Sequence, residues 1–247
     1  MKPLVALVAA PVSALSLALS LAACGGTEQP GAAAEAAATQ SEAPPPDEGG
    51  STSTSTTTTT TAVPERQVTE QGWTPFATVA GITLHHPSAL VERVGFHQSN
   101  HEGARELTPL PTTVAPATLE SRERLTSGRT AADIVSHPET EIRSPVTGTV
   151  KRAGTYVLYC EHSDDYAVIA PDAQPAWEVK LLHIDGVTVR TGDRVVAGQT
   201  VIAPRPTQLP FESQVDELSL VQPAWPHVHV EVVDPSIPNQ PSPGGGC

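Results

Sequence analysis

Residues 227–233 alternate between polar and apolar side chains, in the order His-Val-His-Val-Glu-Val-Val. Successive side chains of a β-strand point to opposite faces, so His227, His229 and Glu231 share one face and the intervening valines share the other. The two imidazoles lie about 6–7 Å apart at a rise of roughly 3.3 Å per residue, so one can bind a metal ion while the other contacts a substrate. The segment therefore predicts a strand with an apolar core face and a chemically active face.

The remaining apolar runs are short, rich in Val, Ile, Tyr and Thr, and separated by Gly and Pro. They cover residues 78–84, 90–97, 149–151, 156–160, 166–170, 177–183, 187–189 and 200–203. Many short strands with frequent turns are typical of an all-β sandwich or barrel. Residues 127–135 are too short and too polar to predict an amphipathic helix. We therefore expect an all-β domain.

The N-terminus has the pattern of an export signal. Lys2 precedes an apolar run over residues 4–21, which ends in small residues before Cys24 and two glycines. This pattern resembles the bacterial lipobox, where a peptidase cuts before a cysteine that carries lipid; an ordinary signal peptide is the alternative. The resemblance implies a signal peptide at residues 1–23 and a lipidated Cys24. A lipid anchor would hold the protein on the extracytoplasmic face of the cell membrane.

Composition divides the rest of the chain. Residues 24–71 are mostly Ala, Pro, Glu, Ser and Thr and predict a disordered tether, and residues 238–247 form a flexible Pro/Gly tail. Residues 72–237 have the length of one domain. The formal net charge is −13, and without a basic patch we expect no nucleic-acid binding.

Two cysteines remain once Cys24 is assigned to the lipid. A disulfide between Cys160 and Cys247 is compatible with an oxidising compartment, but a buried, free Cys160 is the favoured interpretation.

Two segments of the domain are similar to segments of known β-domains. Residues 142–150 and residues 187–200, which hold a Gly-Asp turn, resemble both biotinyl/lipoyl carrier domains and lysostaphin/LytM-type peptidase domains. The carrier family needs an exposed lysine in a tight hairpin, whereas Lys151 and Lys180 lie in strand-like contexts. Lipoprotein export would also separate a carrier from its cytoplasmic ligases. The LytM-type resemblance is therefore favoured.

The order of further motifs extends the LytM-type resemblance. Asp133 comes first, then residues 142–150, then residues 181–184 (Leu-Leu-His-Ile), the Gly-Asp turn, and last residues 227–229 (His-Val-His). The resemblance implies a LytM-type β-roll, a barrel-sandwich of short antiparallel strands, after the disordered tether.

The resemblance also implies a zinc site. The family holds zinc with the His and Asp of a His-x-x-x-Asp segment and with the second histidine of His-x-His. The matching positions here are Arg129, Asp133 and His229. The matches for the family's other two histidines, which act on the zinc-bound water and the developing oxyanion, are His183 and His227.

Arg129 departs from the family pattern, because a guanidinium has no lone pair for a metal. One interpretation is that Arg129 pairs with Asp133 in place of the metal. The other is that a different histidine completes the ligand set. His97 is the favoured substitute ligand, because its strand can approach the site. The other histidines are predicted to be loop, surface or strand-edge residues: His85, His86, His101, His137 and His162.

Three functions follow. The favoured one is a catalytically degenerate LytM-like domain, lipid-anchored, that binds peptidoglycan or a cell-wall enzyme and regulates rather than cuts. The second is an active zinc endopeptidase that cleaves peptidoglycan peptides with an altered ligand set. The third is a structural envelope protein that binds another protein. Arg129 favours the first, whereas the joint presence of Asp133, His183, His227 and His229 supports the second.

Overall fold

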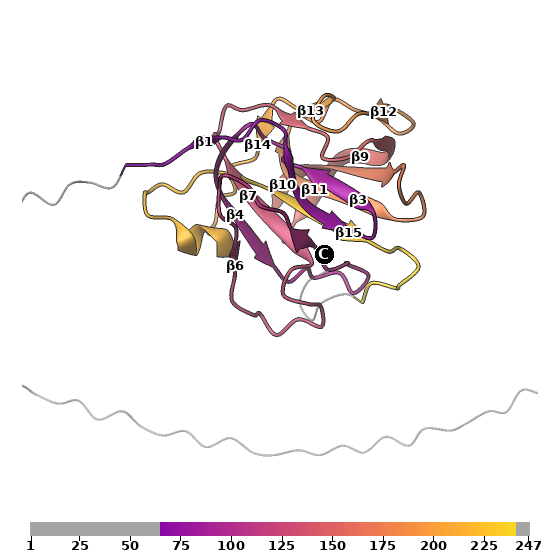
Figure 1. Ribbon diagram of the computed structural model, residues 1–247, viewed down its shortest axis with the longest axis horizontal. Coiled ribbons are helices and arrows are strands. Elements are labelled where there is room, and N and C mark those ends of the chain that lie inside the picture. Colours follow the sequence, from indigo (N-terminus) through magenta and orange to yellow (C-terminus); the bar gives the residue numbers. More distant parts are fainter. Residues whose placement is uncertain (1–64, 241–247) are drawn as a thin grey trace, which may run out of the picture. The chain divides into compact units, whose positions relative to one another are not determined.

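Nearly every element is a β-strand in the part of the chain that the structure describes, residues 65–240 of a computed structural model (Figure 1). The main sheet has the order β1 (Thr69–Glu70), β4 (Leu90–His97), β7 (Ala131–Ser136), β15 (His227–Val233), β11 (Glu178–Asp185), β10 (His162–Pro171), β9 (Gly148–Leu158) and β12 (Arg194–Val195). Neighbours along this order are antiparallel. The expected all-β, antiparallel architecture is confirmed.

Smaller elements complete the fold. β14 (Arg205–Pro206) pairs with β11, and β6 (Ala117–Thr118) runs parallel to β4. A three-stranded sheet joins β3 (Ile82–His85), β2 (Pro75–Val79) and β5 (Thr108–Pro109), and a two-stranded sheet joins β13 (Val201–Ala203) and β8 (Ile142–Arg143). Within residues 65–240 the one helix is a 3₁₀ turn, η1 (Gln214–Leu218). No helix in that range is long and apolar enough to cross a membrane.

The expected features of the two ends lie mostly outside the described residues. These are the signal peptide, Cys24, the tether up to residue 64, and the tail from residue 241, which includes Cys247. β1 falls within the range expected for the tether and pairs with β4.

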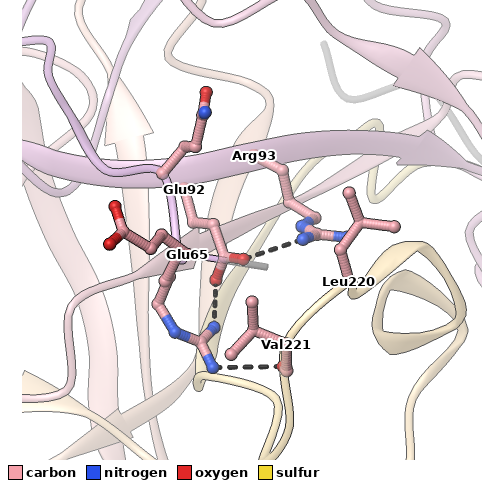
Figure 2. A pocket seen from close by; sticks show the side chains of 7 residues that line it. Glu65, Glu92, Arg93, Leu220 and Val221 are labelled. Carbon is pink, nitrogen blue, oxygen red and sulfur yellow. Dashed lines mark hydrogen bonds and ion pairs between the residues drawn. The ribbon is translucent and has the colours of Figure 1, made fainter. Parts of the chain in front are cut away.

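Arg66, which lies just before β1, bonds to the main sheet and to a loop. Arg66 forms an ion pair with Glu92 of β4, donates to the carbonyls of Val221 and Pro223, and stacks 4.5 Å from the centre of the Trp225 ring. Figure 2 shows the pocket beside this contact, about 480 Å³ in volume, with Glu92 joined to Arg93 at its wall. The pocket is lined by none of the histidines predicted for the site.

The predicted strands are partly confirmed. The strands at residues 90–97 and 227–233 have the predicted bounds. Residues 78–84 instead form a hairpin, because Ala80 and Gly81 adopt positive φ angles of 45° and 83° between β2 and β3. The runs at 149–151 and 156–160 belong largely to one long strand, β9, and residues 187–189 are not a strand.

β7 was not predicted. It is buried along its whole length, so its outer face has no run of exposed polar residues to mark the alternation.

Two further predictions are wrong. Cys160 is exposed and disulfide-bonded, in a tight turn between β9 and β10, so it is not a buried free thiol. His86 is completely buried against the ring of Phe76, 5.1 Å between ring centres, and is not a surface or strand-edge residue.

Four adjacent strands, β4, β7, β15 and β11, form a sheet segment with two unlike faces. One face packs on the core with side chains that are at most 2% exposed: Val94, Phe96, Ala132, Ile134, Val179, Leu181, Val228, Val230 and Val232. Burying each valine or leucine contributes roughly 1.5–3 kcal/mol. This packing fixes which residues point to the opposite face, because a shift of one residue would turn the apolar set outwards.

The opposite face is polar, and its register brings distant residues together. Asp133 of β7 is paired with Gly95 of β4 on one side and with His229 of β15 on the other. On the next rung, Glu231 of β15 pairs with Lys180 of β11. Directly opposite residues of paired strands share a face, so this face collects carboxylates and imidazoles from all four strands.

Candidate metal centre

Three side chains from three adjacent strands converge on this polar face. They are His97 at the end of β4, Asp133 in β7 and His229 in β15, and one potential ligand atom from each lies within 4.8 Å of the others. Nε2 of His97 is 3.0 Å from Oδ1 of Asp133, and Nδ1 of His229 is 2.9 Å from the same oxygen. These three residues can hold a metal ion.

The tautomer of His97 is set by the hydrogen bond at Nδ1, the ring nitrogen that is not next to Asp133. Nδ1 lies 3.0 Å from the carbonyl oxygen of Gln98, which can only accept, so Nδ1 carries the proton. In the neutral ring, Nε2 therefore carries the lone pair. Although it is close to Asp133, it is buried and has no hydrogen bond of acceptable geometry within residues 65–240. A lone pair that faces a carboxylate oxygen at 3.0 Å suits a shared cation.

The spacing and the chemistry of the ligand atoms suit a transition metal. In a tetrahedral site with metal–ligand bonds of about 2.0–2.1 Å, ligand atoms lie about 3.3 Å apart. The two distances that involve Asp133 are slightly shorter than this value, so small adjustments would admit an ion. Two imidazoles and one carboxylate suit zinc and neighbouring first-row metals, and three protein ligands leave a position open.

The electrostatics of the centre favour positive charge. Burial alone would raise the pKa of Asp133, but the imidazoles of His97 and His227 and a hydrogen bond from His229 hold it well below its ordinary value. Burial lowers the pKa of His229, yet the carboxylates of Asp133 and Glu231 outweigh it and raise that pKa to about 9. The metal-free centre therefore keeps a proton where a cation would otherwise sit.

Glu231 lies next to Nε2 of His229, the ring nitrogen that is not bonded to Asp133. Its Oε2 is 3.7 Å from Nε2 of His229 and accepts a hydrogen bond from Ser99, and its Oε1 pairs with Lys180 at 2.9 Å. Burial would raise the pKa of Glu231, but His229 and Lys180 keep it far below the ordinary value. A carboxylate on the outer nitrogen of a ligand histidine orients the ring and increases its basicity. The alternation of residues 227–233 placed Glu231 on this face, whereas Ser99 and Lys180 had no such signal.

His183 and His227 lie beside these three residues. The ring of His183 is 5.0 Å from that of His227 and 6.1 Å from that of His229, measured between centres. Nε2 of His227 is 3.8 Å from Oδ2 of Asp133. Burial lowers the pKa of His227 to about 4, although Asp133 opposes the effect, so this imidazole is neutral at pH 7. The structure thus brings together all four predicted residues and His97.

Arg129 does not replace the metal. Its guanidinium pairs with Glu106, 3.2 Å between Nη2 and Oε1, and both side chains are about half exposed. The predicted alternative pair with Asp133 is therefore wrong, because the Arg129 side chain extends to the surface while His97 occupies the space beside the carboxylate.

Outside the centre, the remaining histidines have local contacts. Nδ1 of His101 accepts from the backbone of Gly103, the ring of His137 makes an edge-to-face contact with Trp225, and His85 contacts the carbonyl of Trp73. His162 is partly exposed in β10.

Comparison with known proteins adds no relative: no protein-family model matches this chain, and no curated protein is significantly similar to it. The interpretation of the chain therefore depends on this centre.

Proposed function

We propose that this chain is a zinc endopeptidase of the lysostaphin/LytM type that cleaves peptidoglycan peptides with an altered ligand set. One observation carries the proposal: Nε2 of His97 lies 3.0 Å from Asp133, and together with His229 these residues form a set of three that could hold a metal ion. Arg129 had favoured a degenerate domain because two ligands hold zinc weakly. A third ligand reverses that preference.

The chain order of the elements supports a LytM-type β-roll. β7 carries Asp133, residues 142–150 follow in β8 and the start of β9, β11 carries His183, and β15 carries the His-Val-His segment. This is the order that the family resemblance implies, with the antiparallel pairing that such a domain needs.

The histidines outside the ligand set suit proton transfer. Zinc held by His97, Asp133 and His229 would polarise a scissile carbonyl and lower the pKa of a nearby water to about 7. His227 is neutral at pH 7 and can accept a proton, and His183 lies against it on the more exposed side. Two imidazoles beside one open position can serve a water molecule and a departing amine.

The N-terminal sequence supports a substrate in the cell wall. An export signal and a lipidated Cys24 would place the chain on the extracytoplasmic face of the membrane, and a tether at residues 24–71 would let the domain reach peptidoglycan.

A second candidate function is a non-catalytic domain that binds peptidoglycan or a cell-wall enzyme. It is favoured by the burial of the centre: the side chains of Asp133 and His227 are only 6% and 4% exposed, and His229 is 13% exposed. A substrate carbonyl would have to approach by way of His229 and His183.

Metal analysis together with a cleavage assay tests the proposal. The purified chain should retain about one zinc per molecule after dialysis and release peptide fragments from peptidoglycan, detected by mass spectrometry. His97→Ala should abolish both properties. The matched control His162→Ala, a histidine outside the centre, should preserve both. Zinc binding without cleavage would favour the binding domain, and failure of the wild-type chain to bind zinc would refute the proposal.

A further inference from the structure

We propose that Asp164 is a positioning residue that fixes the tautomer and the orientation of His183. Its catalytic consequence rests on the function proposed above, whereas the contact itself does not. Asp164 lies in β10, its side chain is about 1% exposed, and neither local sequence pattern nor family resemblance singled it out.

One oxygen of Asp164 accepts from both parts of His183. Oδ2 is 2.7 Å from the ring Nδ1 and 3.1 Å from the backbone nitrogen of the same residue. The Tyr156 hydroxyl donates to this oxygen at 2.7 Å. A carboxylate bound to ring, backbone and phenol has little freedom to move, so it holds the imidazole at a defined angle.

The backbone of His183 requires such support. The β10–β11 register shifts between Asp165 and Tyr166, which leaves His183 as an extra residue in β11. Its φ angle is +62°, a left-handed conformation that is strained for a residue other than glycine. A bulge of this kind redirects a side chain. Leu181 and Ile184 both remain in the core, and His183 turns to the polar face beside His227.

The contact decides which nitrogen of His183 is available. The carboxylate accepts the Nδ1 proton, so the neutral ring has its lone pair on Nε2. When a water molecule attacks, its proton passes to Nε2 and the positive charge forms next to the Asp164 carboxylate. The proton then leaves Nε2 for the departing amine, and His183 returns to its neutral form. Asp164 acts through His183 and contacts no substrate.

Two measurements on three variants test the inference. In the metal-free wild-type chain, the ¹⁵N chemical shifts of His183 should report a protonated Nδ1, and Asp164→Ala should abolish that preference. In the zinc-loaded chain, Asp164→Asn should lower kcat for peptidoglycan cleavage about 100-fold or more, with KM and zinc content within twofold of wild type. Tyr156→Phe, which removes one donor and keeps the carboxylate, should lower kcat several-fold.

Asp165→Asn is the matched control. Asp165 is the next residue and also accepts from backbone groups, Gly186 and Val187, whereas the hydrogen bonds to the ring and backbone of His183 go to Asp164. It should leave kcat and the His183 tautomer unchanged. A wild-type His183 protonated on Nε2, or a kcat unaffected by Asp164→Asn, would overturn the inference even if the enzyme is active. A wild-type chain that cleaves nothing would refute the proposed function, and the tautomer measurement would still decide the role of Asp164.

Discussion

Nε2 of His97 lies 3.0 Å from Oδ1 of Asp133, across the antiparallel pair of β4 and β7. The group that could hold a metal ion therefore includes one histidine from outside the segment that the family resemblance assigns to metal binding. It follows that an arginine at position 129 need not abolish the centre.

Replacing Arg129 should leave metal binding intact. Its guanidinium pairs with the exposed Glu106, so Arg129→Ala removes a surface ion pair that contributes about 0–1 kcal/mol to stability. Zinc affinity, measured by competition with a chromogenic chelator, should stay within twofold of wild type. A loss of zinc in Arg129→Ala, with His97 unchanged, would contradict the ligand set.

Glu231→Gln should weaken metal binding without removing a ligand. The substitution keeps the shape of the side chain but removes the charge beside Nε2 of His229, and the loss of such an outer carboxylate typically costs 10–100-fold in metal affinity. The same chelator competition measures the effect. Glu102→Gln, a change at a partly exposed carboxylate that bonds the backbone of Gln240, is the control and should bind zinc like wild type.

His86 should make the fold sensitive to acid. Neither of its ring nitrogens has a hydrogen-bond partner within residues 65–240, and burial, helped by His85, lowers its pKa from 6.5 to about 4. The unfolded chain binds this proton more tightly, so the free energy of unfolding should fall by about 3 kcal/mol as the pH drops from 7 to 4.

Urea unfolding at several pH values measures this dependence. His86→Leu fills a similar volume without a titratable group and should remove most of it, whereas His162→Leu should retain it. Parallel pH profiles for His86→Leu and wild type would show that His86 is not the cause.

Glu178 should contribute to stability through ion pairs in which its own carboxylate is buried and both cations are partly exposed. Its carboxylate receives both guanidinium nitrogens of Arg152, at 2.8 and 2.6 Å, and Lys151 at 2.8 Å. The bond to Arg152 lowers the pKa of Glu178 to about 2 against the opposing effect of burial. Its stabilisation is therefore complete above pH 4.5 and is lost as the pH falls towards 2.

Glu178→Gln should lower the free energy of unfolding at pH 7 by about 2 kcal/mol, since it leaves two cations with a weaker partner. The comparison is Asp172→Asn, which breaks the exposed pair with Arg194 and should lower the free energy of unfolding much less than Glu178→Gln does. Equal losses for the two variants would show that burial does not strengthen the Glu178 pair.

Local pattern was sufficient to predict β15 and the shared face of His227, His229 and Glu231, because alternation is encoded in neighbouring residues. β7 could not be predicted in this way, because its side chains are buried on both faces and therefore show no alternation of polar and apolar residues. The position of His97 beside Asp133 depends on the pairing of β4 with β7, which no local pattern specifies. The orientation of His183 depends on a bulge, and its contact with Asp164 depends on the register of β10 and β11.

The origin of the three ligands in β4, β7 and β15 has a mechanical consequence. A cation shared by His97, Asp133 and His229 would cross-link three neighbouring strands whose residues are far apart in the sequence. Metal binding would then hold these three strands together across the centre of the sheet, and the availability of metal would affect the rigidity of the domain.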